Sequence, residues 1–155
     1  MLWMAQKKQL DNEDKSLSFS QGVIDMMPLS ISVLPWGILA GSVAIQAGLS
    51  VSQAIAMSAI VFFFFLQLVS LGMVMSGASA LTIFFTIFLI TSQHFIYALT
   101  LRQNIAPLSL KDRLPLGFLL TDELFAVAIS KLDRNKKYLL GAGLSFYIAW
   151  VLFSV

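Results

Sequence analysis

The chain has 155 residues, of which 58 % are hydrophobic and 12 % are charged, and its mean hydropathy is +0.85. In a soluble domain about a quarter of the residues are charged, so this composition excludes an ordinary soluble protein. The formal net charge is only +2, and the basic residues lie in short clusters beside apolar segments, a placement that indicates membrane topology and not nucleic-acid binding. The absence of cysteine excludes disulfides and thiol chemistry.

The apolar runs predict a helical membrane protein. Between Met26 and Leu101 the sequence contains no Asp, Glu, Lys or Arg, which is enough for about three crossings at about 20 residues each. Residues 60–66 and 81–90 do not alternate between apolar and polar side chains, as the strands of a membrane barrel would. We therefore expect an all-α, polytopic transmembrane bundle with about five membrane segments.

The N-terminal tail, residues 1–20, is polar and of mixed charge. It lacks the apolar core and the small-residue cleavage site of a signal peptide, so we expect it to stay on the protein and to face the cytoplasm. Ser18 and Gln21 fit a capping box at the start of the first helix. The remainder, residues 21–155, forms the expected transmembrane domain.

The first apolar segment, Gly22 to Gly48, contains Pro28 and Pro35 and is expected to be kinked or interrupted. In a membrane an interrupted helix is tolerated where protein covers it or where it lines a cavity. The prolines could equally serve packing alone, since proline is common in membrane helices. Gly37 and Gly41 have the spacing that allows two helices to approach closely.

Two further crossings are expected at Val51 to Val74 and Ala80 to Leu101. Gln67, in the second segment, is interpreted more readily as an interhelical hydrogen-bonding residue than as a substrate contact. His94 and Tyr97, in the third, lie on one helix face. A lone histidine is poor support for a metal site, which leaves a structural role and a proton relay open for His94.

The fourth segment, Leu114 to Ser130, has 17 residues and is expected to be tilted, short or re-entrant, and the fifth is Tyr138 to Val155. If every segment crosses, seven basic residues lie inside and three outside, in agreement with the positive-inside rule. The outer three are Arg102, Lys111 and Arg113, and the inner seven are Lys7, Lys8, Lys15, Lys131, Arg134, Lys136 and Lys137. If the first and fourth segments were both re-entrant, all ten would lie inside.

Three acidic residues lie within apolar segments, where a charged side chain is costly and is a functional candidate by default. Asp25 lies near the start of its segment and is interpreted first as an acid near the headgroups. Asp122 and Glu123 lie deeper, but neighbouring positions of a regular helix point about 100° apart. The alternative is that Thr121 and Asp122 begin a helix after an unwound stretch, with free N–H groups that would attract a carboxylate.

We find no glycine-rich phosphate loop and no nucleophile motif with a placed base, so we expect neither an enzyme nor a cofactor or metal site. The order of the motifs resembles that of the AzlC family, the large subunits of bacterial branched-chain amino acid exporters. The resemblance covers residues 19–130 and is carried by Gly22, Pro28, Leu34-Pro35-Trp36-Gly37, Gly41, Gly48-Leu49-Ser50, Met57-Ser58, Val61-Phe62, Gln67, His94, Tyr97, Leu101, Leu120-Thr121-Asp122-Glu123 and Phe125-Ala126.

The resemblance implies export of valine, leucine and isoleucine, with methionine as a further candidate, across the bacterial inner membrane. It also implies a small hydrophobic partner of the AzlD type and an ion gradient as the driving force. The matching residues are Pro28, Pro35, Gly37, Gln67, His94, Tyr97, Thr121, Asp122 and Glu123. We expect the substrate to be bound as a zwitterion, with its carboxylate on backbone amides at a helix end and its ammonium on Asp122 or Glu123.

The chain departs from the family pattern at two places. Phe63 to Leu66 precede Gln67 where small residues are usual, and Gln93 stands where the family has an arginine before the histidine. The chain is also shorter than usual family members, which suggests a truncated form or dependence on a partner. An accessory subunit that is inactive alone, or a channel or carrier for another small solute, are the alternative functions, and the chain could also form homo-oligomers.

Overall fold

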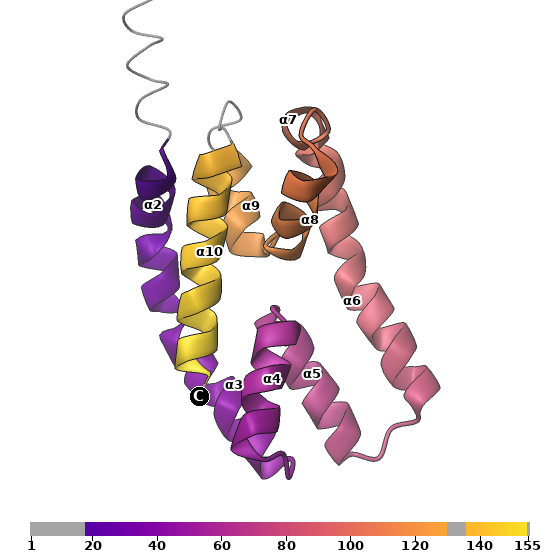
Figure 1. The fold of residues 1–155 in the computed structure, drawn as a ribbon. Coiled ribbons are helices and arrows are strands. Elements are labelled where there is room, and N and C mark those ends of the chain that lie inside the picture. The colour runs from indigo at the N-terminus through magenta and orange to yellow at the C-terminus, as the bar shows by residue number, and fades with distance from the viewer. Residues whose placement is uncertain (1–17, 130–135, 155) are drawn as a thin grey trace, which may run out of the picture.

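The structure is a computed structural model that describes residues 18–129 and 136–154. All regular elements in these residues are α-helices, which confirms the predicted all-α membrane fold (Figure 1). The helices are α2 (Phe19–Ser32), α3 (Leu34–Gln46), α4 (Val51–Ile60), α5 (Phe64–Met75), α6 (Ala80–Thr100), α7 (Arg102–Ile105), α8 (Leu110–Phe118), α9 (Asp122–Ile129) and α10 (Lys136–Phe153). Most of the expected polar tail lies outside the described residues. Ser18 caps α2, because its hydroxyl accepts a hydrogen bond from the backbone N–H of Gln21.

The first apolar segment is broken, as expected, at Val33. Helices α2 and α3 meet there at an angle of 54°, and together they are long and apolar enough to form one broken span. Pro28 lies inside α2, whereas Pro35 lies in the first turn of α3, where its missing N–H costs no intrahelical hydrogen bond. The break therefore falls between the two prolines.

The segment at Val51 to Val74 is not the single crossing that the sequence predicted. Helix α4 ends at Ile60, residues 61–63 are non-helical, and α5 begins at Phe64. Both helices lie in the lower part of the molecule in Figure 1, with their connection pointing upward. The prediction was wrong because Phe62 leaves the helical path and packs into the core, 8 % exposed, where its ring meets those of Phe146 and Tyr147.

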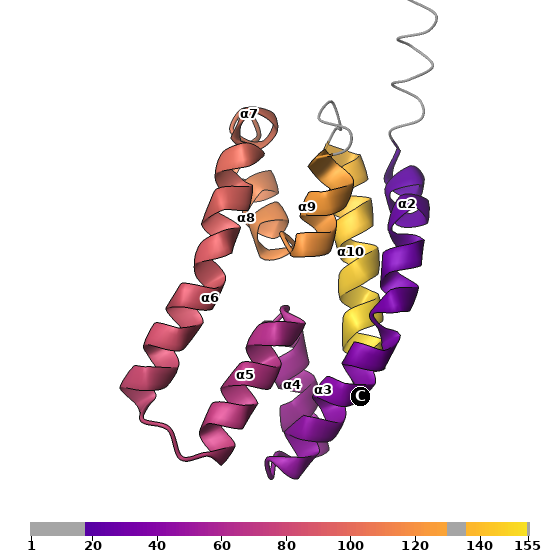
Figure 2. The ribbon, with the colours of Figure 1, turned by 180° about the vertical axis from the view of Figure 1, so that it is seen from behind.

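The fourth segment forms a second hairpin that enters from the opposite end of the molecule. Helices α8 and α9 are separated by residues 119–121, and both lie in the upper part of Figures 1 and 2 with their connection pointing down. This confirms the expected break in the fourth segment. The two hairpin tips meet at mid-height, where the rings of Phe62 and Phe118 stack with centroids 6.0 Å apart.

Two elements run the length of the molecule, one on either side of these hairpins (Figure 1). Helix α6 is long and apolar enough to cross a membrane alone, and the α2–α3 pair is the other span that passes this test among the described residues. Helix α10 packs along α2 and α3. Their backbones approach closely because Gly22 faces the backbone of Tyr138 and Ala142, while Gly141 faces that of Phe19.

Because α4 and α5 form a hairpin, the basic residues are distributed over the two ends of the molecule differently from the prediction. Lys136 at the start of α10 forms an ion pair of 2.9 Å with Asp112 in the first turn of α8. Lys111 and Arg113, the sequence neighbours of Asp112, therefore lie at the same end of the molecule as Lys136, and Arg102 in α7 lies there too (Figure 1). The five-crossing arrangement, in which Arg102, Lys111 and Arg113 lie opposite Lys136, was therefore wrong, because the chain returns at residues 61–63 instead of crossing.

Candidate functional site

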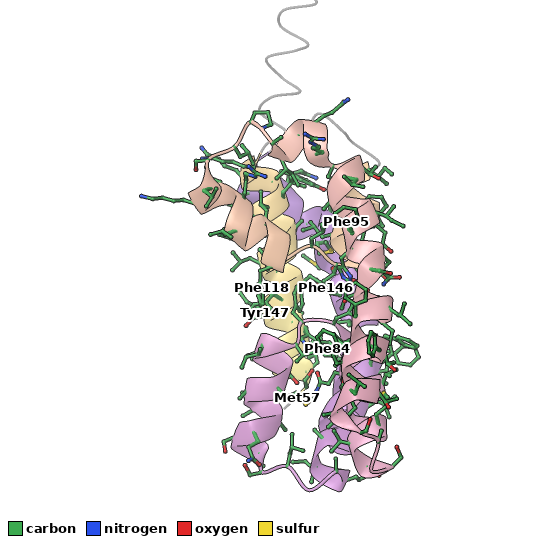
Figure 3. All side chains as sticks on the ribbon, turned by 90° about the vertical axis from the view of Figure 1, so that its right-hand side faces the viewer. Met57, Phe84, Phe95, Phe118, Phe146 and Tyr147 are labelled. Carbon is green, nitrogen blue, oxygen red and sulfur yellow. The ribbon has the colours of Figure 1, made fainter. Side chains whose placement is uncertain are left out.

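A cavity of about 410 Å³ lies where the helix breaks meet. The break between α2 and α3 contributes Val33, and the two hairpin tips contribute aromatic and acidic side chains. The remaining walls come from α3, α6 and α10. The lining residues are Val33, Trp36, Phe62, Phe63, Phe64, Phe65, Gln93, Thr121, Asp122, Glu123, Phe146 and Trp150. In Figure 3, Phe118, Phe146 and Tyr147 are seen at the mid-height of the molecule, between Phe95 above and Met57 below.

The acidic wall of this cavity is the first turn of α9. Thr121 is 2 % exposed and its hydroxyl accepts a hydrogen bond of 3.4 Å from the Leu124 amide, so the helix begins at Asp122. The predicted helix start after an unwound stretch is therefore present. Asp122 and Glu123 both line the cavity, and carboxylates in a first helical turn interact favourably with the helix dipole.

Two side chains of α6 contact the carboxylate of Asp122. The side-chain amide nitrogen of Gln93 lies 3.4 Å from its Oδ1, and the Tyr97 hydroxyl forms a hydrogen bond with the same carboxylate. The Tyr97 ring also stacks on Phe125 of α9, with centroids 4.3 Å apart and planes at 18°. Glu123 is half-buried and accepts a hydrogen bond from the Thr121 hydroxyl. Gln93 is neutral, so the donor that meets the Asp122 carboxylate here carries no charge.

His94 lies behind the cavity and does not line it. Its ring meets Phe63 edge-on at 4.9 Å and lies 5.7 Å from the Tyr97 ring. Its buried Nδ1 has no hydrogen-bond partner in the described part of the chain. It lines a neighbouring cavity of about 310 Å³, and Phe63 lines both cavities.

Gln67 and Asp25 also lie outside the acidic cavity. Gln67 is fully buried and exchanges hydrogen bonds of 3.1 and 3.4 Å with the Ser58 hydroxyl, which joins α5 to α4 within the first hairpin. Asp25 accepts hydrogen bonds of 2.7 Å from Gln21 and from Tyr138, which joins α2 to α10. Both side chains connect neighbouring helices.

Gly37 and Gly41 lie where α3 meets the end of α10. A side chain at Gly37 would collide with Phe153, and one at Gly41 would collide with the backbone of Ser154. The close approach that their spacing predicts is thus made with α10. The two glycines hold α10 near the cavity, to which it contributes Phe146 and Trp150.

Residues 28–155 match the family model described as AzlC protein. The chain belongs to the AzlC family. It is 30 % identical over 146 residues to the inner membrane protein YgaZ of Escherichia coli K12, and this match covers 90 % of the chain and 60 % of YgaZ. It is 33 % identical over 139 residues to a protein of Archaeoglobus fulgidus described as an uncharacterized membrane protein, with 88 % of the chain and 60 % of that protein covered.

This AzlC chain thus spans 60 % of the length of both relatives. No solved structure shows a significant match to it. Membership in the AzlC family and the similarity to membrane proteins suggest a role related to membrane transport. The described residues of the chain contain no group of three or more side chains suited to hold a metal ion.

Sequence reasoning did not identify which aromatic residues form the walls of the cavity. Trp150 is 1 % exposed, and its indole N–H donates a hydrogen bond of 3.1 Å to the Ser58 carbonyl, while the Tyr147 hydroxyl donates one of 2.9 Å to the Ala59 carbonyl. Both acceptors lie in the last turns of α4, whose C-terminal carbonyls lack intrahelical partners. The only signal in the sequence was the presence of polar-tipped aromatic residues in the last apolar segment.

The start of α5 also faces the cavity. Its N-cap is Phe63, whose side chain cannot accept a hydrogen bond, and Phe63, Phe64 and Phe65 line the cavity. The first N–H groups of any helix have no intrahelical partner. The cavity of the AzlC chain therefore has an uncapped helix start on one wall and two carboxylates on another.

Proposed function

We propose that this chain is the large subunit of a secondary transporter that exports branched-chain amino acids across the bacterial inner membrane. Valine, leucine and isoleucine are the proposed substrates, with methionine as a further one, and a small AzlD-type membrane subunit is the proposed partner. The observation that carries the proposal is the pairing of Asp122 and Glu123 with aromatic walls in one cavity between two hairpin tips. Transporter sites of this kind are formed by interrupted helices near the bilayer midplane.

The substrate ammonium binds at Asp122 and Glu123. The described residues that line the cavity include no lysine, arginine or histidine, so the lining contains no basic side chain to pair with the two carboxylates. Glu123 is half-buried, and a carboxylate removed from water without a cation is costly, so an amino group restores the balance. A solute that lacks the ammonium would leave this charge unpaired, which makes the site selective.

The substrate carboxylate binds at the start of α5. At the start of α9 the Thr121 hydroxyl already accepts a hydrogen bond from the Leu124 N–H. The acidic side chains of the first turn, Asp122 and Glu123, also make this helix start unfavourable for a second carboxylate. The start of α5 has no side-chain cap, so its N–H groups are free to receive an anion. The α4–α5 hairpin thus binds the carboxylate of the zwitterion, and the α8–α9 hairpin binds its ammonium. The two hairpins enter from opposite ends of the molecule.

The aliphatic side chain of the substrate packs against the aromatic walls. Trp36, Phe62, Phe146 and Trp150 supply apolar surface from α3, the first hairpin and α10. Burying a branched side chain of this size contributes about 1.5–3 kcal/mol. The apolar walls favour valine, leucine and isoleucine over polar amino acids.

The end of the molecule that carries Lys111, Arg113 and Lys136 faces the cytoplasm in this proposal. The described lysines and arginines all lie in α7, α8 and α10, at or near that end. Cytoplasmic loops carry an excess of Lys and Arg, so this arrangement supports a cytoplasmic N-terminus and insertion in the inner membrane. Transport then moves the substrate past the two hairpin tips.

Coupling to an ion gradient is assigned to His94 and Tyr97. Tyr97 hydrogen-bonds Asp122 on one side and contacts the His94 ring on the other. A histidine in a membrane helix that communicates with an acid can relay protons. This arrangement gives the Asp122 carboxylate, which binds the substrate ammonium, a route for proton exchange without a nucleotide.

The proposal is tested by efflux of labelled valine from cells preloaded with a valine-containing dipeptide. The chain is expressed alone, with an AzlD-type subunit, or omitted. Saturable efflux that requires both subunits is the expected result. Unsaturable flux would favour a channel, and no efflux in any combination would overturn the proposal in favour of an accessory subunit.

A further inference from the structure

A third cavity, of about 590 Å³, lies between the end of α6, α7 and α8. It shares no lining residue with the acidic cavity. Its walls are mainly apolar and include Leu99, Leu110, Leu114 and Leu120, while Arg102 and Arg113 are its charged residues. The cavity therefore combines an apolar groove with two guanidinium groups.

The side chains of Arg102 and Arg113 do not stabilise the fold through an ion pair with another described residue. Neither forms an ion pair within residues 18–129 and 136–154, and both side chains are exposed. The acid between Lys111 and Arg113, Asp112, is instead paired with Lys136 at 2.9 Å. Arginine presents a planar fork of donors that fits the oxygens of a phosphate. The charge of the cavity is thus available for an anionic phosphate group.

The groove runs from these charges into the protein. Leu99, Leu110 and Leu114 are 52 %, 68 % and 67 % exposed, whereas Leu120, in the tip of the second hairpin, is 7 % exposed. Helix α8 runs from the basic end of the molecule toward mid-height (Figure 1). A ligand with a phosphate at the arginines could therefore extend an apolar chain along α8 to Leu120.

We propose that this cavity binds one anionic phospholipid. Its phosphate lies on Arg102 and Arg113, and one acyl chain lies along the leucines of α6 and α8. A zwitterionic lipid such as phosphatidylcholine fits less well, because its choline group places a cation near two guanidinium groups. The acyl chain ends beside Leu120, next to Thr121, so the lipid stabilises the tip on which α9 starts.

The test is native mass spectrometry of the full chain in detergent, titrated with phosphatidylglycerol, with phosphatidylcholine and with inorganic phosphate. The expected result is a single bound phosphatidylglycerol, preferred over phosphatidylcholine by roughly tenfold. Arg102→Gln with Arg113→Gln should remove that preference. The matched control, Lys111→Gln with Lys137→Gln, loses the same charge outside the cavity and should keep it.

A third variant tests the apolar half of the site. Leu114→Asn leaves the charge unchanged and should weaken phosphatidylglycerol binding severalfold while inorganic phosphate binding stays as weak as before. Equal binding of phosphatidylglycerol and phosphatidylcholine to the wild type would overturn the proposal. An equal loss of the preference for phosphatidylglycerol in the arginine double variant and in the lysine double variant would also overturn it. Binding of inorganic phosphate as tight as that of phosphatidylglycerol would assign the site to a free anion and would also overturn it.

Discussion

The side-chain amide nitrogen of Gln93 lies 3.4 Å from the carboxylate of Asp122, which ties the long helix α6 to the first residue of α9. The two residues are 29 positions apart and meet only because the second hairpin folds back into the protein. A neutral donor at this position orients the carboxylate without cancelling its charge. The acidic wall of the cavity therefore stays open to a cationic ligand.

Gln93→Leu tests this contact. The substitution keeps the side-chain volume and removes the donor, so Asp122 is less well oriented, and the KM for valine export is expected to rise roughly threefold to tenfold, the range of one lost hydrogen bond. The measurement is saturable valine efflux. Ser92→Ala is the control, because Ser92 is exposed and its hydroxyl donates a hydrogen bond to the Leu89 carbonyl of its own helix. An unchanged KM in Gln93→Leu would show that the contact does not serve the substrate.

The hairpin at α4 and α5 predicts the sidedness of the turns at its two ends. Because the chain carries no cysteine, single substitutions can be labelled with a membrane-impermeant maleimide. Gln46→Cys and Ser76→Cys, both exposed, should be labelled from one side of the membrane, and Gln103→Cys from the other. If Gln46→Cys and Ser76→Cys were labelled from opposite sides, residues 51–75 would cross the membrane and the hairpin would be wrong.

The close packing of α2 on α10 predicts a strong effect at Gly141. A Cβ atom there would collide with the backbone of Phe19, which cannot move as a flexible side chain can. Gly141→Ala is expected to destabilise the protein by about 1–3 kcal/mol, measured as a lower Tm in detergent. Gly72→Ala is the control, because no atom lies within 4 Å of a Cβ at that position. Equal Tm values for the two variants would contradict the close contact.

The ion pair between Asp112 and Lys136 predicts a pH-dependent contribution to stability. Hydrogen bonds from Lys136 and from Ser109 lower the pKa of Asp112 below its ordinary value of 3.8. Folding thus favours the ionised carboxylate, so the contribution is complete above pH 3.8 and is lost as the pH falls through the lowered pKa.

Asp112→Asn should therefore lower the Tm slightly at pH 7, since the pair is exposed, and the difference should shrink at pH 3. The measurement is the Tm of both proteins in detergent at several pH values. In a Lys136→Gln background the effect of Asp112→Asn should be smaller throughout. A difference that grew on acidification would contradict the assignment.

Much of this architecture could be predicted from the sequence, because charge-free apolar runs and prolines act locally. The break near Pro28 and Pro35 and the helix start at Thr121 follow from rules on backbone hydrogen bonding. The return of the chain at residues 61–63 could not be predicted in this way. A run of four phenylalanines is compatible with a continuous helix, and the hairpin depends on where Phe62 packs, between Phe118 and residues of α10.

The candidate site was predictable only on its polar side. Asp122 and Glu123 stand out because acidic residues are rare in apolar segments, and Thr121 stands out as a helix cap directly before them; the structure brings all three to one cavity. His94, Gln67 and Asp25 stand out for the same reason but lie elsewhere, since a polar side chain can serve helix contacts equally well. The aromatic walls gave only a weak signal, because aromatic residues are common throughout this chain.

The most direct test of the account is saturable valine efflux by the chain with its partner subunit, compared among the wild type, Asp122→Asn, Glu123→Gln and the surface control Asp112→Asn. The account predicts that at least one of the two cavity variants loses transport efficiency, kcat/KM, by roughly tenfold or more, because a charge pair with the substrate ammonium is removed. Asp112→Asn should transport as the wild type does. Wild-type export by both cavity variants would contradict the assignment of the acidic cavity as the substrate site.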